Sequence, residues 1–161
     1  MGIKNLTEAE EKEFYRLVEK MNGKAKKPEY WDTVYYIDYI GRIRKRTWIN
    51  DEYALDMWEL GNIFFTKKEA EFAREKRKVE VELERYAKEH NGTASTNRRY
   101  LIRYEEDEKS LICDTWATAK IQGTVMFTSR DVLTAAIEAV GKDRILKYIF
   151  GVESEGEEKC Q

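Results

Sequence analysis

The fold is decided by the stretch Gly61-Asn62-Ile63-Phe64-Phe65-Thr66-Lys67-Lys68-Glu69-Ala70, in which a short apolar strand runs directly into the longest helix that the sequence predicts. Its pattern recurs at Gly123-Thr124-Val125-Met126-Phe127-Thr128-Ser129-Arg130-Asp131-Val132, with a glycine, four strand-forming residues, a threonine and an acid three positions later. In both copies the threonine hydroxyl is predicted to accept the backbone N–H three residues later while the acid reaches back, which is a capping box. We therefore interpret the two stretches as copies of one strand-to-helix unit.

The overall charge narrows the classes of function. Among the 161 residues, 29 Lys and Arg nearly cancel 31 Asp and Glu, which leaves a net charge of −2. This balance indicates neither a generally basic nucleic-acid binder nor a DNA-mimicking polyacid, so any electrostatic recognition must be local. At this length we expect one domain, or two small repeats that share a core.

The cysteines and the hydropathy indicate a reducing compartment. Cys113 lies in a predicted strand and Cys160 in the last residues of the sequence, so there is no disulfide framework and no pair at metal-ligand spacing. No apolar run approaches the ~20 residues that a membrane span needs. The expected location is therefore the cytoplasm, without secretion or membrane insertion.

Residues 1–29 are predicted to form an N-terminal helix and a connector. Thr7-Glu8-Ala9-Glu10 has the pattern of a capping box, and Asn22-Gly23 ends the helix. Between them, apolar residues at helical spacing make one stripe, formed by Phe14, Leu17, Val18 and Met21. Residues 24–29 contain the only proline of the chain and are predicted to form the connector.

Residues 30–92 are predicted to form the first unit. Strands at 34–38 and 43–48 make a hairpin, residues 50–60 are ambiguous between a loop and a short helix, and a third strand covers 63–65. The long helix runs from Lys67 to about His90 and would be ~36 Å long. Its apolar seam is narrow, which leaves one end able to project or to pair with another chain; the seam residues are Phe72, Val79, Leu83 and Tyr86.

Residues 93–150 are predicted to form the second unit, which begins with a polar linker at 93–97. Strands at 99–104 and 111–116 flank an acidic turn and again end on a tryptophan, so that Trp116 corresponds to Trp48. The longer connection after Trp48 indicates an insertion at 51–60 in the first unit. A helix at 129–140, a glycine stop and a short helix at 142–150 follow, and residues 151–161 are expected to form an acidic disordered tail.

The predicted fold class is α+β, with two tandem β-hairpin–strand–helix repeats around a mixed or antiparallel sheet and an added N-terminal helix. Three strands with one helix bury too little surface to be stable alone. We therefore expect the two halves to pack together.

The motif residues of the first half resemble a family. The chain resembles small accessory proteins of phages and prophages of Gram-positive hosts in four successive motifs. They are Tyr35-Tyr36-Ile37-Asp38, a glycine turn, Trp48-x-Asn50-Asp51 and Gly61-Asn62-x-Phe64-x-Thr66-Lys67-x-Glu69-Ala70-Glu71. The resemblance covers roughly residues 30–90 and, more loosely, the second copy with Asp143-Arg144-Ile145. It implies an accessory protein in the host cell, in a class that includes inhibitors of bacterial defence. Such inhibitors act by binding, either to a nucleotide signal or to a protein.

Most catalytic chemistries lack the residues that they need. His90 is the only histidine and lies at a predicted helix C-terminus, where it is expected to cap the last carbonyls. Without a second histidine or a nearby cysteine, neither a nucleophilic triad nor a zinc site can be assembled. A Mg²⁺-dependent nuclease remains an alternative if carboxylates gather at the strand ends; the candidates are Asp38, Asp51, Asp56 and Asp114.

Aromatic and arginine residues alternate on the two predicted hairpins. A nucleobase is bound by stacking, and a phosphate by Arg side chains and the N–H groups of a helix start. The predicted ligand-binding residues are Tyr35, Tyr36, Arg44, Trp48, Asn50, Thr66, Lys67, Arg99, Tyr100, Arg103, Trp116, Thr128 and Ser129. In the alternative interpretation the aromatics belong to the core, the arginines are solvated and the threonines only cap helices.

Basic clusters along the chain are interleaved with acids. In the predicted long helix, Arg74 and 76–78 alternate with glutamates at three- and four-residue spacing. This pattern favours a solvated helix with many ion pairs over a nucleic-acid interface.

The function hypothesis is a non-enzymatic phage accessory protein, without a cofactor, that counters host defence by sequestering a small nucleotide signal. One alternative is a protein-binding inhibitor of a host defence nuclease or effector, which would use the seam of the long helix and the insertion at 51–60. That alternative predicts an exposed apolar patch that holds Tyr53 or Trp58. A nucleic-acid binder or a carboxylate-metal nuclease is the other alternative, and homodimerisation through the long helix is a further expectation.

Overall fold

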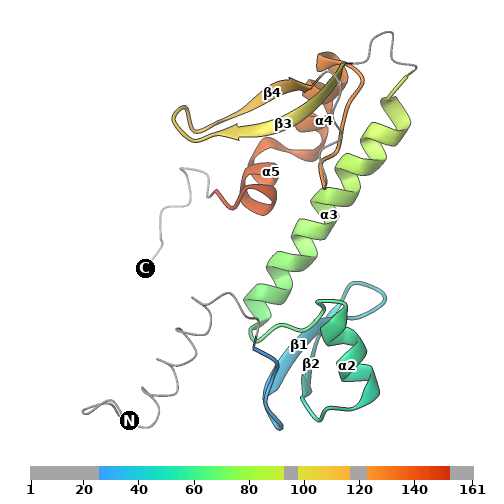
Figure 1. The fold of residues 1–161 in the computed structure, drawn as a ribbon, viewed down its shortest axis with the longest axis vertical. Coiled ribbons are helices and arrows are strands. Elements are labelled where there is room, and N and C mark those ends of the chain that lie inside the picture. The colour runs from blue at the N-terminus through green and yellow to red at the C-terminus, as the bar shows by residue number, and fades with distance from the viewer. Residues whose placement is uncertain (1–25, 93–97, 117–122, 153–161) are drawn as a thin grey trace, which may run out of the picture. The chain divides into compact units, whose positions relative to one another are not determined.

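The computed structural model describes residues 26–92, 98–116 and 123–152, and the chain has the predicted α+β class (Figure 1). In chain order the elements are β1 (Thr33–Ile37), β2 (Ile43–Thr47), α2 (Glu52–Glu59), α3 (Lys67–His90), β3 (Arg99–Glu105), β4 (Ser110–Trp116), α4 (Arg130–Val140) and α5 (Lys142–Ile149). The predicted N-terminal helix, the linker at 93–97 and most of the acidic tail lie outside the described residues.

The chain divides into two compact units, Met1–Ala70 and Glu71–Gln161. The division falls inside α3, whose first turn belongs to the first unit and whose remaining turns belong to the second. The sequence prediction instead placed the boundary after Gly92 and kept the long helix with the first hairpin. The packing of the α3 side chains described below explains this difference.

In the first unit, β1 and β2 pair antiparallel, with Thr33 opposite Thr47 and Ile37 opposite Ile43. The predicted third strand is reduced to one antiparallel bridge between Tyr35 and Phe64, whose backbone N–H and C=O groups exchange hydrogen bonds of 2.8 and 2.9 Å. Beyond the bridge, the Asn62 side chain bonds to the backbone of Ile37 in place of a neighbouring strand. Its amide oxygen accepts from the Ile37 N–H at 3.0 Å, and its amide nitrogen donates to the Ile37 carbonyl at 2.8 Å.

The core of the first unit lies between this hairpin and α2. Asp51 caps α2 by accepting the Ala54 N–H at 2.8 Å, which resolves residues 52–59 as a helix. Buried side chains from the hairpin, from α2 and from the segment before α3 make the core; they are Val34, Trp48, Ala54, Met57 and Ile63. The helix is therefore set by its cap and by the face that it buries against Trp48.

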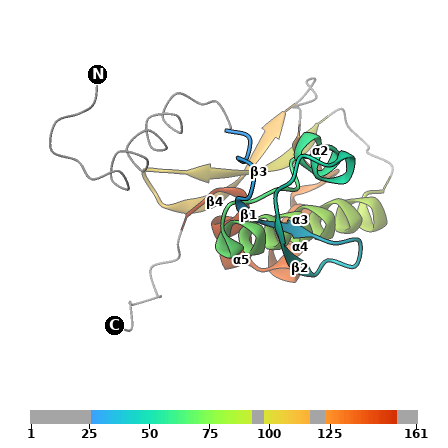
Figure 2. The ribbon, with the colours of Figure 1, turned by 90° about the horizontal axis from the view of Figure 1, so that it is seen from below.

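In the second unit, β3 and β4 pair antiparallel from Arg99 opposite Trp116 to Glu105 opposite Ser110. Again a single bridge joins the first strand of the hairpin to a phenylalanine, here Tyr100 to Phe127. The core combines residues of three helices with Phe127; it contains Val79, Leu83, Ala87, Phe127, Leu133, Ala136, Val140 and Ile145. Figures 1 and 2 show α4 and α5 beside α3 in this unit.

The seam of α3 is buried in this second core. Val79 is fully buried and Leu83 is nearly so, and both pack with residues of α4 and α5. Val79 and Leu83 are therefore not available to another chain, while the expectation that one end of the helix projects or pairs with a second copy stays a prediction. Phe72, which is partly exposed, packs its ring against Tyr148 of α5 at 5.3 Å between ring centres.

The two predicted capping boxes have different outcomes. At the start of α3, the Glu69 N–H donates to the Thr66 hydroxyl at 3.2 Å and the Glu69 carboxylate accepts the Thr66 N–H at 3.2 Å, as predicted. At the start of α4, the cap is Ser129, which accepts the Val132 N–H at 3.2 Å, so the prediction of Thr128 is wrong. The N–H and the hydroxyl of Thr128 instead donate to the side-chain oxygen of Asn91, which follows α3.

Within the described residues, no helix has both the length and the apolar character that a membrane span needs.

Candidate functional site

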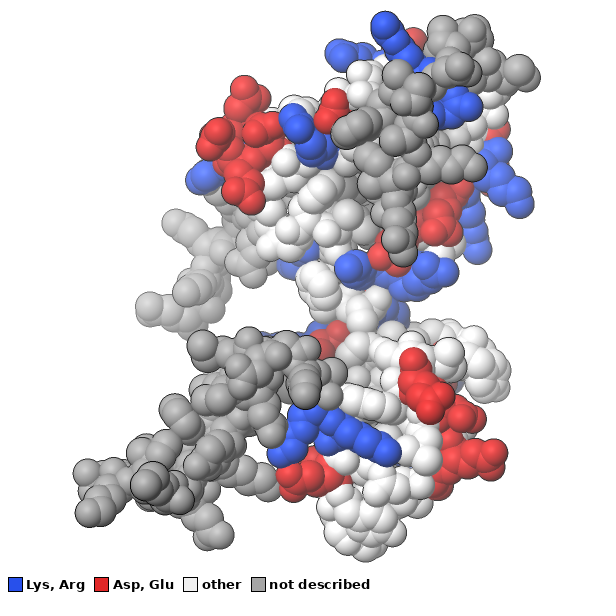
Figure 3. Space-filling model, viewed as in Figure 1, with Lys and Arg blue, Asp and Glu red and all other residues white. Residues whose placement is uncertain are grey.

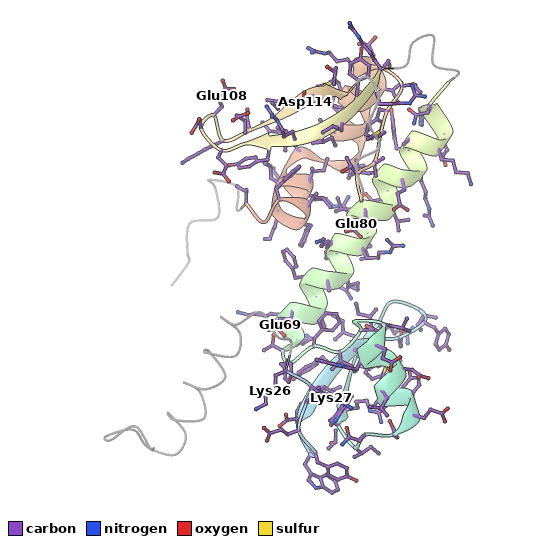
Figure 4. All side chains as sticks on the ribbon, in the orientation of Figure 1. Lys26, Lys27, Glu69, Glu80, Glu108 and Asp114 are labelled. Atoms are coloured by element: carbon purple, nitrogen blue, oxygen red, sulfur yellow. The ribbon has the colours of Figure 1, made fainter. Side chains whose placement is uncertain are left out.

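Seven of the predicted ligand-binding residues lie in the first unit, where the pleat of the hairpin separates Tyr35 from Tyr36 and Arg44. Trp48 is fully buried, and its indole N–H donates to the Asn50 side-chain oxygen at 2.7 Å. The amino group of Lys27, which Figure 4 labels, lies 5.8 Å from the centre of the Trp48 ring. Tyr36 points to the same side, since it packs against the core and against the Tyr53 ring. Tyr35 lies between two residues of that face and therefore points to the opposite side.

Arg44 is held by the turn of the first hairpin. Its guanidinium donates to the Asp38 carboxylate at 2.9 Å, and the same carboxylate accepts the N–H groups of Ile40 and Arg42. Desolvation raises the pKa of Asp38, but the hydrogen bonds from the Arg42 N–H and the Arg44 side chain outweigh it and leave the pKa below its ordinary value. The predicted anion-binding arginine is thus paired with a carboxylate inside its own hairpin.

Thr66 and Lys67 stand at the start of α3. The backbone N–H groups of Phe65 and Thr66 are the donors that an anion would need, and both donate to the Glu69 carboxylate, at 3.0 and 3.2 Å. The helix start therefore already carries a negative group of its own.

The other six predicted residues lie in the second unit. Tyr100 packs against the core, and Ser129 caps α4. Arg103 is paired with two carboxylates, at 3.0 Å from Glu105 and 3.5 Å from Asp114, which Figure 4 labels on β4. The remaining three are Arg99, which donates to the Arg98 carbonyl at 3.0 Å, Trp116, which is opposite Arg99 in the sheet, and Thr128, which is bonded to Asn91.

A small cavity of about 150 Å³ opens in the second unit between α3, β3 and α5. Leu83, Ile102 and Ile145 are among its lining residues, and Glu80, labelled in Figure 4, is its one acidic lining residue among those described. Of the predicted ligand-binding residues whose side chains are described, none lines this cavity. Its lining is mainly apolar, which does not match the stacking and anion-binding chemistry predicted for a nucleotide.

The described part of the chain offers no metal centre. Across 26–92, 98–116 and 123–152, no three His, Cys, Asp or Glu side chains gather closely enough to hold an ion. The candidate carboxylates have other uses, since Asp38 stabilises a turn and Asp51 caps α2. His90 stacks on Tyr86 at 3.9 Å between ring centres, with Nδ1 2.9 Å from the Tyr86 carbonyl, which fits the capping interpretation.

The sequence reasoning missed a pair of aromatic residues that precede β1. Trp31 is 72% exposed and stacks edge-to-face on Tyr30, at 5.1 Å between ring centres. Its backbone has a φ of 77°, in the region that favours glycine. Two backbone hydrogen bonds hold the turn. The Trp31 N–H donates to the Trp48 carbonyl, and the Asp32 N–H donates to the Glu29 carbonyl. The only sequence signal is the Tyr-Trp pair between the proline and the first strand.

Exposed apolar side chains are concentrated in the first unit. Nine large hydrophobic side chains of the described residues are exposed, and eight of them lie between residues 30 and 65: Tyr30, Trp31, Tyr39, Ile40, Ile49, Tyr53, Leu60 and Phe65. We call these eight residues the first-unit apolar surface. Figure 3 shows wide uncharged areas on the visible face of this unit, between smaller charged patches. The ninth residue is Phe72.

No protein-family model, no curated protein and no solved structure matches this chain.

Proposed function

We propose that this protein is a non-catalytic binding protein that attaches to another protein through the first-unit apolar surface. The observation that carries the proposal is the concentration of eight exposed large hydrophobic residues between positions 30 and 65, with Trp31 at 72%. Single exposed apolar residues are normal, whereas contiguous apolar patches mark interaction sites. Within this group, the rings of Tyr30 and Trp31 are in contact, with 5.1 Å between their centres. Four of the eight are Tyr or Trp, and these residue types are enriched among the residues that dominate binding energy.

Trp31 is the proposed anchor of the interface. A tryptophan that is 72% exposed contributes little to the core, and its left-handed backbone costs on the order of 1–3 kcal/mol. Folding alone therefore gives no reason for this residue at this position. A rigid aromatic ring that is already presented to solvent loses little entropy on binding, which is a reason to retain it.

Tyr53 on α2 extends the proposed interface into the insertion at 51–60. Its side chain is 55% exposed, as the protein-binding hypothesis requires. The Arg46 guanidinium lies 5.5 Å from its ring centre and is itself bonded to Asp51 at 2.7 Å, while Tyr36 packs edge-to-face against the same ring. These contacts orient the Tyr53 ring before any partner arrives.

The resemblance to phage accessory proteins suggests the partner. Under this proposal the protein acts in the host cell and binds a defence nuclease or effector, whose activity it blocks. Sequestration of a nucleotide has weaker support, because Trp48 is buried and because Arg44 and Arg103 are each paired with carboxylates of their own hairpins.

The proposal is tested by affinity capture from a Gram-positive host extract with the full chain. The test variant combines Trp31→Gly and Tyr53→Ala, which remove two exposed rings of the first-unit apolar surface. The matched control is Phe72→Ala, which removes the exposed aromatic residue outside that surface. We expect a protein that the wild type and the control retain and the test variant loses. Retention of the same proteins by all three would contradict the proposal.

A further inference from the structure

The β1–β2 hairpin is a two-stranded ribbon with two outer edges, and the edge of β1 is already bonded (Figure 1). The backbone N–H and C=O groups of Tyr35 exchange hydrogen bonds with Phe64. Those of Ile37 are bonded to the Asn62 side chain. The segment before α3 is therefore the neighbour of β1 on this side.

The edge of β2 is the other side of the ribbon. In an antiparallel pair, two opposite residues turn their backbone groups either both toward the partner strand or both away from it. Lys45 is opposite Tyr35, whose backbone groups turn away from β2, so the backbone groups of Lys45 turn away from β1. Ile43 and Thr47, two positions to either side, have the same orientation. We call the backbone groups of Ile43, Lys45 and Thr47 the β2 edge.

The β2 edge is available for pairing. Within residues 26–92, 98–116 and 123–152, no hydrogen bond engages the backbone N–H or C=O groups of its three residues. Lys45 and Thr47 are exposed, and Ile43 is half-buried. The edge therefore offers a row of backbone donors and acceptors to an added strand, which is one way in which sheets bind extended segments of other proteins.

The corresponding edge of the second unit is different. There, Tyr100 bonds to Phe127, so the residue opposite it on β4 that turns its backbone groups outward is Thr115. The Thr115 N–H donates to the carboxylate of the adjacent Asp114 at 2.7 Å. One donor of the β4 edge is thus already used, and an acidic side chain lies beside it.

Basic side chains flank the β2 edge. Residues 42–46 include three arginines and a lysine but no acid. Arg44 pairs with Asp38 and Arg46 pairs with Asp51, whereas Lys45 has no ion pair within the described residues. Positive charge is therefore left at the centre of the edge.

This charge selects the kind of strand that can pair with β2. Two antiparallel copies of β2 that used the whole edge would bring Lys45 opposite Lys45, and Arg44 opposite Arg46. Like charges opposite each other in a sheet are destabilising, and a lysine on an edge strand is a common means of preventing self-association. A strand with carboxylates opposite these basic residues has the reverse effect.

Building on the protein-binding function proposed above, we propose that the β2 edge binds an extended acidic segment of the partner as an additional antiparallel strand. The edge adjoins the first-unit apolar surface, since Ile49 follows β2 by two positions and the Arg46 guanidinium lies 5.5 Å from the centre of the Tyr53 ring. Main-chain bonds to β2 fix the register of the segment, while the rings of the apolar surface contact the rest of the partner.

The test is hydrogen exchange of the backbone amides, measured by NMR on the full chain with and without a capped peptide of sequence TVEEEVT. Aligned with β2, its glutamates face Arg44, Lys45 and Arg46, and its valines face Ile43 and Thr47. We expect the peptide, at millimolar concentration, to slow exchange severalfold at the three amides of the β2 edge. The amides of Arg44 and Arg46 already bond to β1 and should not change.

Two controls separate strand pairing from attraction between charges. The same peptide with an N-methyl group on its central glutamate keeps its charge but lacks the N–H that bonds to the Lys45 carbonyl, so the slowing should be lost. Lys45→Glu should weaken the binding of TVEEEVT about fivefold, because like charges then face each other. Lys76→Glu makes the same change of charge at an exposed position of α3 and should leave the affinity unchanged.

Three results would overturn the proposal. The first is an unchanged exchange rate at the β2 edge in the presence of the peptide. The second is an equal loss of affinity in Lys45→Glu and Lys76→Glu, which would show attraction between charges only. The third is slowing that depends on protein concentration without peptide, which would assign the edge to a second copy of the chain.

These outcomes are independent of the test of the proposed function. The capture experiment changes Trp31 and Tyr53, which lie outside the β2 edge, and the peptide experiment uses no host protein. Failure of the peptide experiment alone would leave the apolar surface as the interface. Failure of the capture experiment alone would remove that interface and leave the pairing of the β2 edge with an acidic strand intact.

Discussion

Arg144 of α5 donates two hydrogen bonds to the Glu82 carboxylate of α3, at 2.6 and 3.0 Å, and a third to the Val140 carbonyl at the end of α4, at 3.0 Å. One side chain thus joins the three helices of the second unit. The pairing is bidentate, which is the strong geometry for a guanidinium and a carboxylate. Both side chains are about 40% exposed, so solvent screening reduces the energy of the pair.

Replacing Arg144 by methionine should therefore destabilise the second unit by about 1 kcal/mol. The measurement is chemical unfolding followed by circular dichroism. The matched control is Arg77→Met, because the bond from Arg77 to Glu80 is longer, at 3.5 Å, and the arginine is 67% exposed. We expect the control to change the free energy of unfolding by less than ~0.5 kcal/mol. Equal effects of the two substitutions would show that Arg144 does not join the helices.

The same ion pair predicts a dependence of stability on pH. The hydrogen bond from Arg144 is the main reason that the pKa of Glu82 lies below its ordinary value of 4.5. A carboxyl whose pKa is lower in the folded state adds stability above its ordinary pKa and loses that contribution as the pH falls through the folded-state value. The melting temperature of the wild type should therefore exceed that of Glu82→Gln at neutral pH, and the difference should vanish in acid. A difference that persists unchanged from about pH 7 to pH 3 would exclude this origin.

The observed cap of α4 predicts a specific loss of stability. Ser129→Ala removes the acceptor of the Val132 N–H and should cost about 1 kcal/mol in the free energy of unfolding. Thr134→Ala, an exposed substitution in the middle of the same helix, is the control and should leave stability unchanged or slightly raised. Urea unfolding of the three proteins measures the difference. If Ser129→Ala matched the wild type, the capping role of Ser129 would be wrong.

At Trp31 we expect a substitution that does not lower the stability of the fold, because the backbone conformation at this position favours glycine. Trp31→Gly removes an exposed side chain from a position with a φ of 77°, so the melting temperature should stay the same or rise. Trp48→Ala is the contrasting substitution, since it empties a fully buried site and should cost on the order of 3–5 kcal/mol. A large loss of stability in Trp31→Gly would mean that Trp31 serves the fold and not a partner.

Much of the secondary structure was predictable because its signals are local. The helix from Lys67 to His90 has a capping box at its start and Asn91-Gly92 after its end, and both hairpins have alternating apolar residues around a polar turn. These signals depend only on residues that are close in the sequence. The α+β class and most element boundaries follow from them.

The sequence could not determine those features that depend on residues distant in the chain. Thr128 has the pattern of a cap, but Asn91, 37 positions earlier, accepts its hydrogen bonds and leaves the capping role to Ser129. The apolar seam of α3 was expected to be able to contact another chain, because no neighbouring residue in the sequence indicates that Val79 and Leu83 pack with α4 and α5. The predicted ligand site depended on aromatic residues whose position in the core or on the surface is set by packing, as the burial of Trp48 illustrates.

Photo-crosslinking in the host cell tests the proposed protein interface most directly. A photoreactive phenylalanine analogue is placed in the full chain at Trp31, at Tyr53 or, as the control, at Phe72. Because Trp31 and Tyr53 belong to the first-unit apolar surface and Phe72 does not, we predict one crosslinked host protein common to the first two positions and absent from the third. Equal crosslinking at all three positions, or none at Trp31 and Tyr53, would contradict the proposed interface.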